Sequence, residues 1–280
     1  MATSPLFDLT SANVNPDQPI LLYDGDDHKI YWVGVHSAGE EIECNSYLIV
    51  DGGAGYLLEP GGFDRFGPVF KKVCYLISPS AVSHMYFSHQ DPDICASFPS
   101  WIKWNENIQM IVSSLWTRFM PHYESRDISG ESYHLNFIPV GDEGATIPLK
   151  SGGRLECISA PYLHSPGNIL LFDTTSGFLF SGDVGASMFK DRAFHLLIDN
   201  WDSHTDAMRG FHQRYMSCNR AVAGMINTLR GRQITALLPQ HGAIFRQAEV
   251  ARYFAWLSHL PVGADYLYRD MLRIPTQAGH

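Results

Sequence analysis

Histidine and aspartate side chains gather in one short segment of the first third of the chain. Residues 88–94 read SHQDPDI and follow an apolar run, residues 82–87, that indicates a buried strand. His89, Asp91 and Asp93 lie at positions i, i+2 and i+4, a spacing that puts three side chains on one side of an extended backbone. Imidazole and carboxylate groups that converge in this way indicate half of a metal site. The alternative is structural: Asp93 caps the next helix and His89 is a hydrogen-bonded loop histidine.

Three further segments place one such residue shortly after an apolar, strand-like run. These residues are His164 after residues 155–159, Asp183 after residues 178–180, and His241 after residues 234–238. Each of them alone is equally well explained as a turn or core residue. The same arrangement at four places, in a chain whose other histidines lack it, favours a common metal site.

Short strand-like runs dominate both halves of the chain, and helical periodicity lies between and after them. The predicted strands are residues 30–35, 47–50, 55–58, 82–87, 108–112, 137–140, 145–149, 155–159, 169–172, 178–180 and 234–238. The predicted helices are residues 66–76, 101–104, 114–120, 205–229, 248–257 and 264–272. Two β-rich halves with helices outside them predict one α/β domain over residues 1–280, a four-layer αβ/βα sandwich, with residues 1–28 as an extended N-terminal arm.

The composition argues against several classes of protein. The 280 residues are 45% hydrophobic and 18% charged, which is typical of a folded chain with a sizeable core. The formal net charge of −9 argues against nucleic acid and anionic membranes as partners, because both need a basic face. Five cysteines without a C-x-x-C pair favour a reducing compartment, so we predict a cytoplasmic protein that has no membrane span.

The order of these motifs resembles a known superfamily. The order H-x-D-x-D, then H, then S-x-D, then H-G resembles that of the metallo-β-lactamase superfamily, and within it the chain resembles the flavodiiron and oxygen-binding diiron branch. Residues 44–50 resemble the N-[AS]-Y-L-[IV] strand of that branch, residues 160–166 its A-P-x-L-H-x-P segment, and residues 178–183 its x-L-F-S-x-D strand. The resemblance covers most of the chain and implies a dinuclear metal site.

The resemblance assigns the candidate ligands to two metals. The first metal would be held by His89, Asp91 and His164, the second by Asp93 and His241, and both would be bridged by Asp183. The resemblance also places Tyr215 and His36 near the gas pocket, outside the ligand set.

Two positions depart from the superfamily pattern. Asp91 stands where diiron members usually carry Glu and hydrolases carry His. Ile94 stands where the superfamily often has a histidine ligand of the second metal. We therefore expect the second metal to lack a protein ligand, and we expect Ile94 to make that side of the pocket open and apolar.

The donor types favour iron. Three histidines and three carboxylates, with no thiolate, form an oxygen-rich set that suits iron or manganese better than zinc. Two Fe(II) ions together with three carboxylates have a formal charge of about +1, and two Fe(III) ions with the same carboxylates and one oxo bridge also have about +1. Because the charge of the site stays the same, oxidation of both irons has little electrostatic cost. We expect two iron ions, with two zinc, mixed iron and zinc, or manganese as alternatives.

The resemblance implies a non-haem diiron protein that binds O2 or NO and either reduces or senses it. As an enzyme it would be an oxidoreductase. Flavodiiron enzymes carry a flavodoxin domain, for which 280 residues leave no room, so we expect no FMN and a separate partner. That partner would be an electron donor, such as rubredoxin or a flavoprotein, or a signalling protein; a homodimer is also open.

Two other functions compete with this one. The first is a dinuclear zinc hydrolase of a thioester, lactone or phosphoester, in which metal-bound hydroxide attacks the substrate. Asp91 in place of histidine argues against it. The second is an interaction protein with a relic site, and the complete set of six candidate ligands argues against that.

Overall fold

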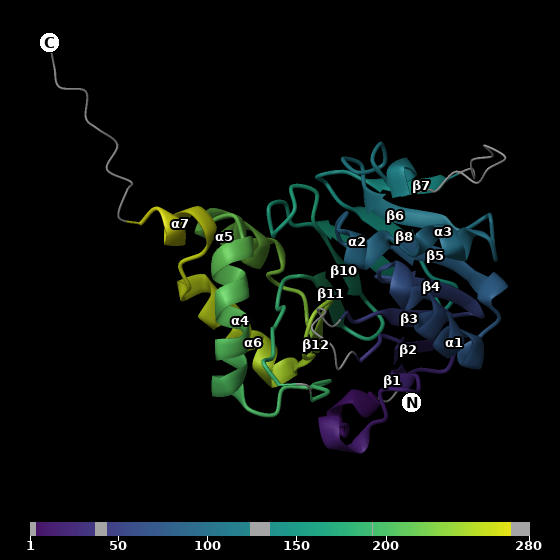
Figure 1. Ribbon diagram of the computed structural model, residues 1–280, viewed down its shortest axis with the longest axis horizontal. Helices are drawn as coiled ribbons and strands as arrows, with labels where there is room; N and C mark the ends of the chain where they lie inside the picture. Colours follow the sequence, from purple (N-terminus) through teal and green to yellow (C-terminus); the bar gives the residue numbers. More distant parts are fainter. Residues whose placement is uncertain (1–3, 37–43, 124–134, 192, 270–280) are drawn as a thin grey trace, which may run out of the picture.

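The computed structural model describes residues 4–36, 44–123, 135–191 and 193–269. Two mixed β-sheets face each other, with helices on their outer faces (Figure 1). The first sheet contains, in spatial order, β1 (Ile20–Asp24), β2 (His28–Trp32), β3 (Tyr47–Asp51), β4 (Ala54–Leu58), β5 (Val82–Tyr86), β6 (Gln109–Ser113) and β7 (Asn136–Val140). The second sheet contains β13 (Phe245–Arg246), β12 (Ala236–Pro239), β11 (Phe178–Gly182), β10 (Ile169–Asp173), β9 (Arg154–Ser159) and β8 (Ala145–Pro148). The predicted α/β sandwich is confirmed.

The helices cover the two outer faces. They are α1 (Phe66–Leu76), α2 (Pro92–Cys95), α3 (Phe98–Ile102), α4 (Trp201–Tyr215), α5 (Asn219–Thr228), α6 (Gln247–His259) and α7 (Gly263–Leu267). Helices α1 to α3 pack on the first sheet, and α4 to α6 on the second (Figure 1). Short 3-10 helices complete the fold: Pro5–Phe7, Ser11–Asn13, Phe63–Arg65, Pro79–Ala81 and Met120–Tyr123.

The central strands, such as β3, β10 and β11, are buried on both faces because each has a sheet on one side and helices on the other. In β3, Tyr47 and Ile49 belong to the core between the sheets, whereas Leu48 belongs to the core beneath α1 to α3. In β10, Leu171 faces the central core and Leu170 faces the helices of the second sheet. The alternation has the two-residue period of a strand, and burial on both faces explains the nearly continuous apolar runs in the sequence.

The strand predictions match the structure closely, as does the first helix, whereas three other expectations are wrong in part. Residues 205–229 form two helices, because residues 216–218 are extended: Ser217 N donates to Tyr162 O at 3.2 Å, and Cys218 forms a β-bridge with Gly263. These tertiary contacts outweigh the helical periodicity.

Residues 114–119 form turns rather than a helix, and β1 lies within the predicted arm. Residues 1–3, and residues 270–272 of the last predicted helix, lie outside the described residues.

In the described part of the chain, no helix combines the length and the apolar character that a membrane span requires.

A buried histidine joins the two sheets at the end remote from the predicted metal ligands. His28 of β2 places Nδ1 2.9 Å from Asp51 Oδ2 and Nε2 2.9 Å from Asp173 Oδ2, and all three side chains are almost completely buried. Burial alone would lower the pKa of His28, but the carboxylates of Asp173 and Asp51 outweigh burial and raise this pKa. The charged His28 therefore ties β2 and β3 of one sheet to β10 of the other.

Replacement of His28 by alanine should leave two carboxylates buried without their cation, and we expect a loss of about 3–5 kcal/mol in the free energy of unfolding. Because the pKa of His28 is raised on folding, its contribution is complete below a pH of about 6.5 and is lost as the pH rises through the folded-state pKa. Urea denaturation over a pH series measures both effects. His259→Ala, at an exposed position on α6, is the control; equal stability of the two variants would contradict the assignment.

Candidate metal centre

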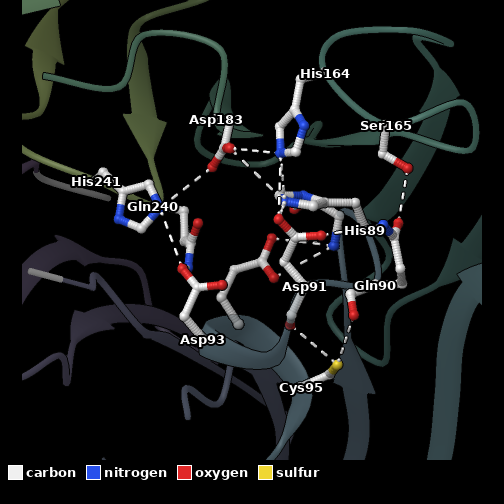
Figure 2. A network of polar contacts seen from close by, with 12 residues as sticks. His89, Gln90, Asp91, Asp93, Cys95, His164, Ser165, Asp183, Gln240 and His241 are labelled. Carbon is white, nitrogen blue, oxygen red and sulfur yellow. Dashed lines mark hydrogen bonds and ion pairs between the residues drawn. The ribbon is translucent and has the colours of Figure 1, made fainter. Parts of the chain in front are cut away.

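The six predicted metal ligands lie together at one end of the two sheets (Figure 2). They are His89, Asp91 and Asp93 after β5, His164 after β9, Asp183 after β11, and His241 after β12. Strands β11 and β12 are parallel neighbours, so Asp183 and His241, which follow their carboxyl ends, lie at the same end of the second sheet. Ile169 N donates to Ser88 O at 2.9 Å, and this bond fixes the first sheet against the second beside the site.

The first cluster consists of His89, Asp91, His164 and one oxygen of Asp183. The Nε2 atoms of His89 and His164 point at each other, 3.1 Å apart. Asp183 Oδ2 lies 2.9 Å from His164 Nε2 and 3.7 Å from His89 Nε2. Asp91 Oδ2 lies 3.5 Å and 3.6 Å from the same two nitrogens. Ligand atoms about 2.1 Å from one ion are about 3.0–3.4 Å apart, so these atoms fit around a single metal.

The second cluster uses the other oxygen of Asp183. His241 Nε2 lies 3.4 Å from Asp183 Oδ1 and 3.3 Å from Asp93 Oδ2. Gln240 Nε2 donates a hydrogen bond of 3.1 Å to the same oxygen of Asp93. Asp183 thus presents one carboxylate oxygen to each cluster, which is the geometry that a bridging carboxylate needs.

The turn from strand to helix separates Asp93 from its neighbours. Asp91 has extended backbone angles and Pro92 begins α2, so Asp93 lies in the first helical turn and faces His241 rather than His89. The expectation that all three side chains share one side of an extended segment is therefore wrong for Asp93. The alternative that Asp93 caps the helix is also wrong, since Asp91 is the N-cap residue and α2 has no side-chain capping hydrogen bond.

Opposite charges shift the pKa values throughout the site. Burial alone would lower the pKa of His164, but Asp183 and Asp91 raise it to about 10. Burial alone would raise the pKa of Asp183, but His89, His164 and His241 lower it to about 2. The histidines thus keep the buried carboxylate of Asp183 ionised, which is the form that binds a cation.

Residues behind the ligands hold them in position. Ser88 Oγ lies 3.0 Å from His89 Nδ1, a contact that leaves Nε2 to face the cluster. Ser88 N donates at 3.1 Å to the carboxylate of Glu59, and burial raises the pKa of Glu59 to about 7. On the other side, Gly185 N donates at 3.1 Å to His212 Nε2, which fixes the turn that carries Asp183.

A cavity of about 680 Å³ gives access to both clusters. Tyr215 lines it, and its ring meets His164 edge-on with 5.9 Å between ring centroids. Phe211 stacks on Tyr215 at 4.6 Å, so α4 supplies an aromatic wall to the cavity. Tyr215 thus lies beside His164, and its role at a gas pocket, which the resemblance implies, stays a prediction.

Two predicted neighbours of the site lie elsewhere. His36 packs on Phe194, with 5.4 Å between ring centroids, and is not among the described residues that line the cavity. Ile94 is fully buried in the core beneath α1 to α3, and it too is absent from the described lining. The expectation that Ile94 makes the gas pocket apolar is wrong, because the helical turn at Pro92 directs its side chain into the core.

Sequence reasoning missed Cys44. Its thiol is buried, and ligand-capable atoms of Cys44, Asp93 and His241 all lie within 4.8 Å of one another. The predicted ligand set contains no sulfur and does not include this cysteine. The available signal was the position of Cys44, next to Asn45 at the start of the strand motif that supported the resemblance.

Solved structures of related proteins share the fold of this chain. A structure described as the peroxy diiron species of the chemotaxis sensor ODP is 34% identical, with a TM-score of 0.78, over 90% of this chain and 99% of that one. The apo state of the chemotaxis sensor ODP from T. denticola is 37% identical, with the same TM-score, over 90% of this chain and 98% of the other. Rubredoxin oxygen:oxidoreductase from Desulfovibrio gigas, at 18% identity and a TM-score of 0.71, covers 85% of this chain and shares the fold.

Longer proteins contain a related segment. Diflavin flavoprotein A 1 of Synechocystis sp. (strain PCC 6803) is 25% identical over 122 residues, which are 43% of this chain and 20% of that protein. This chain spans about a third or less of the length of the curated relatives that it matches. Residues 42–242 match the family described as ODP family beta lactamase, and the chain therefore belongs to the ODP family of metallo-β-lactamase-like domains.

Proposed function

We propose that this chain is a non-haem diiron protein that binds O2 or NO, and that it senses or reduces the gas with the help of a separate partner protein. The observation that carries the proposal is the pair of clusters that share Asp183, with one carboxylate oxygen toward each. The match to the chemotaxis sensor ODP, over nearly all of the sensor chain, supports sensing over reduction.

The proposed ligands keep the roles that the resemblance gives them. The first ion would be held by His89, Asp91 and His164, the second by Asp93 and His241, and Asp183 would bridge the two. The oxygen-rich donor set suits iron. When bound, two ferrous ions supply the electrons for a two-electron change at the gas.

The protein itself positions the ligands and shapes the entrance. The hydrogen bond from Gly185 to His212 fixes the turn that carries Asp183, and the contact between Ser88 and His89 fixes the His89 ring. Because protein groups already orient these two metal ligands, their side chains need to move little when metal or gas binds. Tyr215 and Phe211 limit access to His164 from the solvent side. We therefore assign Tyr215 a role in controlling access, next to the ligands rather than among them.

The partner and the compartment follow from the same proposal. A sensor needs a signalling protein and a reductase needs an electron donor, so either one would contact the chain from outside. None of the five cysteines, all of which lie in the described part of the chain, forms a disulfide; this fits a reducing compartment, and we propose the cytoplasm.

A zinc hydrolase stays the competing function because of one observation. Cys44 lies beside Asp93 and His241, and sulfur donors suit zinc as well as iron. The metal content of the purified protein separates the two proposals.

Protein produced in iron-replete cells and purified without oxygen should contain about two irons per chain, because the six proposed ligands are rich in oxygen. Admission of air or NO should change the absorption spectrum of the reduced protein. The measurements are elemental analysis and anaerobic absorption spectroscopy. Two zinc ions per chain, together with thioester hydrolysis, would instead establish the hydrolase.

His241→Ala should lower occupancy of the second metal site more than that of the first, and His89→Ala should do the reverse, because each histidine faces a different cluster. Anomalous diffraction from crystals of each iron-loaded variant measures the occupancy of each site separately. His122→Ala, at an exposed position, is the control and should bind like the unmodified chain. Full occupancy of both sites in either ligand variant would remove that residue from the ligand set.

A further inference from the structure

Cys44 lies at the second cluster without a role in the ligand set described so far. Its Sγ is 3.7 Å from Asp93 Oδ2 and 3.9 Å from His241 Nδ1, and its side chain lines the site cavity. Only 5% of the residue is exposed to solvent. The thiol thus lies beside Asp93 and on the Nδ1 side of the His241 ring, whose Nε2 faces Asp93 and Asp183. Ligand-capable atoms of Cys44, Asp93 and His241 all lie within 4.8 Å of one another, which is close enough for one ion.

The neighbouring residue fixes this placement. The side-chain amide of Asn45 donates to Pro239 O at 3.0 Å and to Gly242 O at 2.8 Å, one on each side of His241. Asn45 N also donates to Gln240 O at 2.6 Å. Three hydrogen bonds therefore hold the Cys44 segment in register with the loop that carries His241.

The second cluster is also the one that needs another donor. By resemblance its histidine ligand would come from position 94, but Ile94 is buried in the core beneath α1 to α3. Asp183 Oδ1, which is buried and faces this cluster, has no hydrogen-bond partner among the described residues. Without Cys44, the second ion would have ligands only from Asp93, His241 and Asp183.

The other buried cysteine near the metal motif does not compete for this role. Cys95 Sγ donates to the backbone carbonyls of Gln90 and Asp91, at 3.2 Å and 3.1 Å. Figure 2 shows it beyond Asp91, away from Asp183 and His241. Among the described residues, the groups whose spacing suits a metal ion include Cys44 and no other cysteine.

We propose that Cys44 is a sulfur ligand of the second metal ion and completes a set with Asp93, His241 and the bridging Asp183. This assignment rests on the proposed dinuclear function. On binding, the metal–sulfur bond replaces the S–H bond and the proton passes to solvent. The second ion then has one sulfur, one nitrogen and two carboxylate ligands, whereas the first has two nitrogens and two carboxylates.

The inequality of the two sites has a functional consequence. Thiolate sulfur donates more electron density than imidazole, so it stabilises the more oxidised state of the ion it binds. Cys44 would therefore make the two ions unequal in redox behaviour, and it would hold the second ion although position 94 supplies no ligand.

Titration of the metal-free full chain with Co(II) tests the assignment, because a cobalt–thiolate bond gives an intense near-ultraviolet charge-transfer band that oxygen and nitrogen ligands do not. We expect two cobalt ions per chain and the appearance of this band as the second cluster fills. Cys44→Ser and Cys44→Ala should lose the band and still bind the first ion. Affinity for the second ion should fall at least about tenfold in Cys44→Ala.

Cys157→Ala is the matched control, because Cys157 is buried in the central core away from the site, and it should keep the band and both affinities. Two bound cobalt ions without the band in the unmodified chain would overturn the role of Cys44 and leave the dinuclear function standing. Binding of fewer than two ions would overturn both. Because the unmodified chain alone gives these outcomes, the test holds even if a Cys44 variant fails to fold.

Discussion

One buried carboxylate, that of Asp183, constrains the rest of the site. Its two oxygens face different groups of side chains, with Oδ2 toward His164 and Oδ1 toward His241. Burial of a carboxylate costs several kcal/mol unless charge and hydrogen bonds compensate for it. The fold must therefore bring histidines from both sides of Asp183 to within ion-pair distance, and this requirement fixes how the strand ends of the two sheets align.

The turn before Asp183 leaves no room for a side chain at position 182. Gly182 has a φ of +55°, and a Cβ atom there would lie 2.6 Å from Ser88 Oγ. A side chain at this position would push away Ser88, which contacts His89. The glycine thus allows the strand end to pass close to the first sheet, so that Asp183 reaches ligands from both sheets.

The sequence predicted the features that local pattern determines. Apolar runs predicted most strands, and chemically reactive residues placed after those runs predicted a site where strand ends meet, as His89 and Asp183 illustrate. Features that depend on distant contacts were not predictable. The break between α4 and α5 depends on Tyr162 and Gly263, and the approach of Cys44 to His241 depends on hydrogen bonds made by Asn45. The inward direction of Ile94 likewise depends on where α2 begins.

The charges of the cluster explain how such a site stays folded before metal arrives. Asp91 and Asp183 would repel each other in a buried place, but His89 and His164 lie between them, and the pKa of His164 is raised to about 10. At neutral pH the metal-free site therefore keeps protons on imidazole groups that lie among its carboxylates. A metal ion that entered the site would displace those protons and bind the same carboxylates, so the charge balance that keeps the metal-free site folded would also prepare it for the metal.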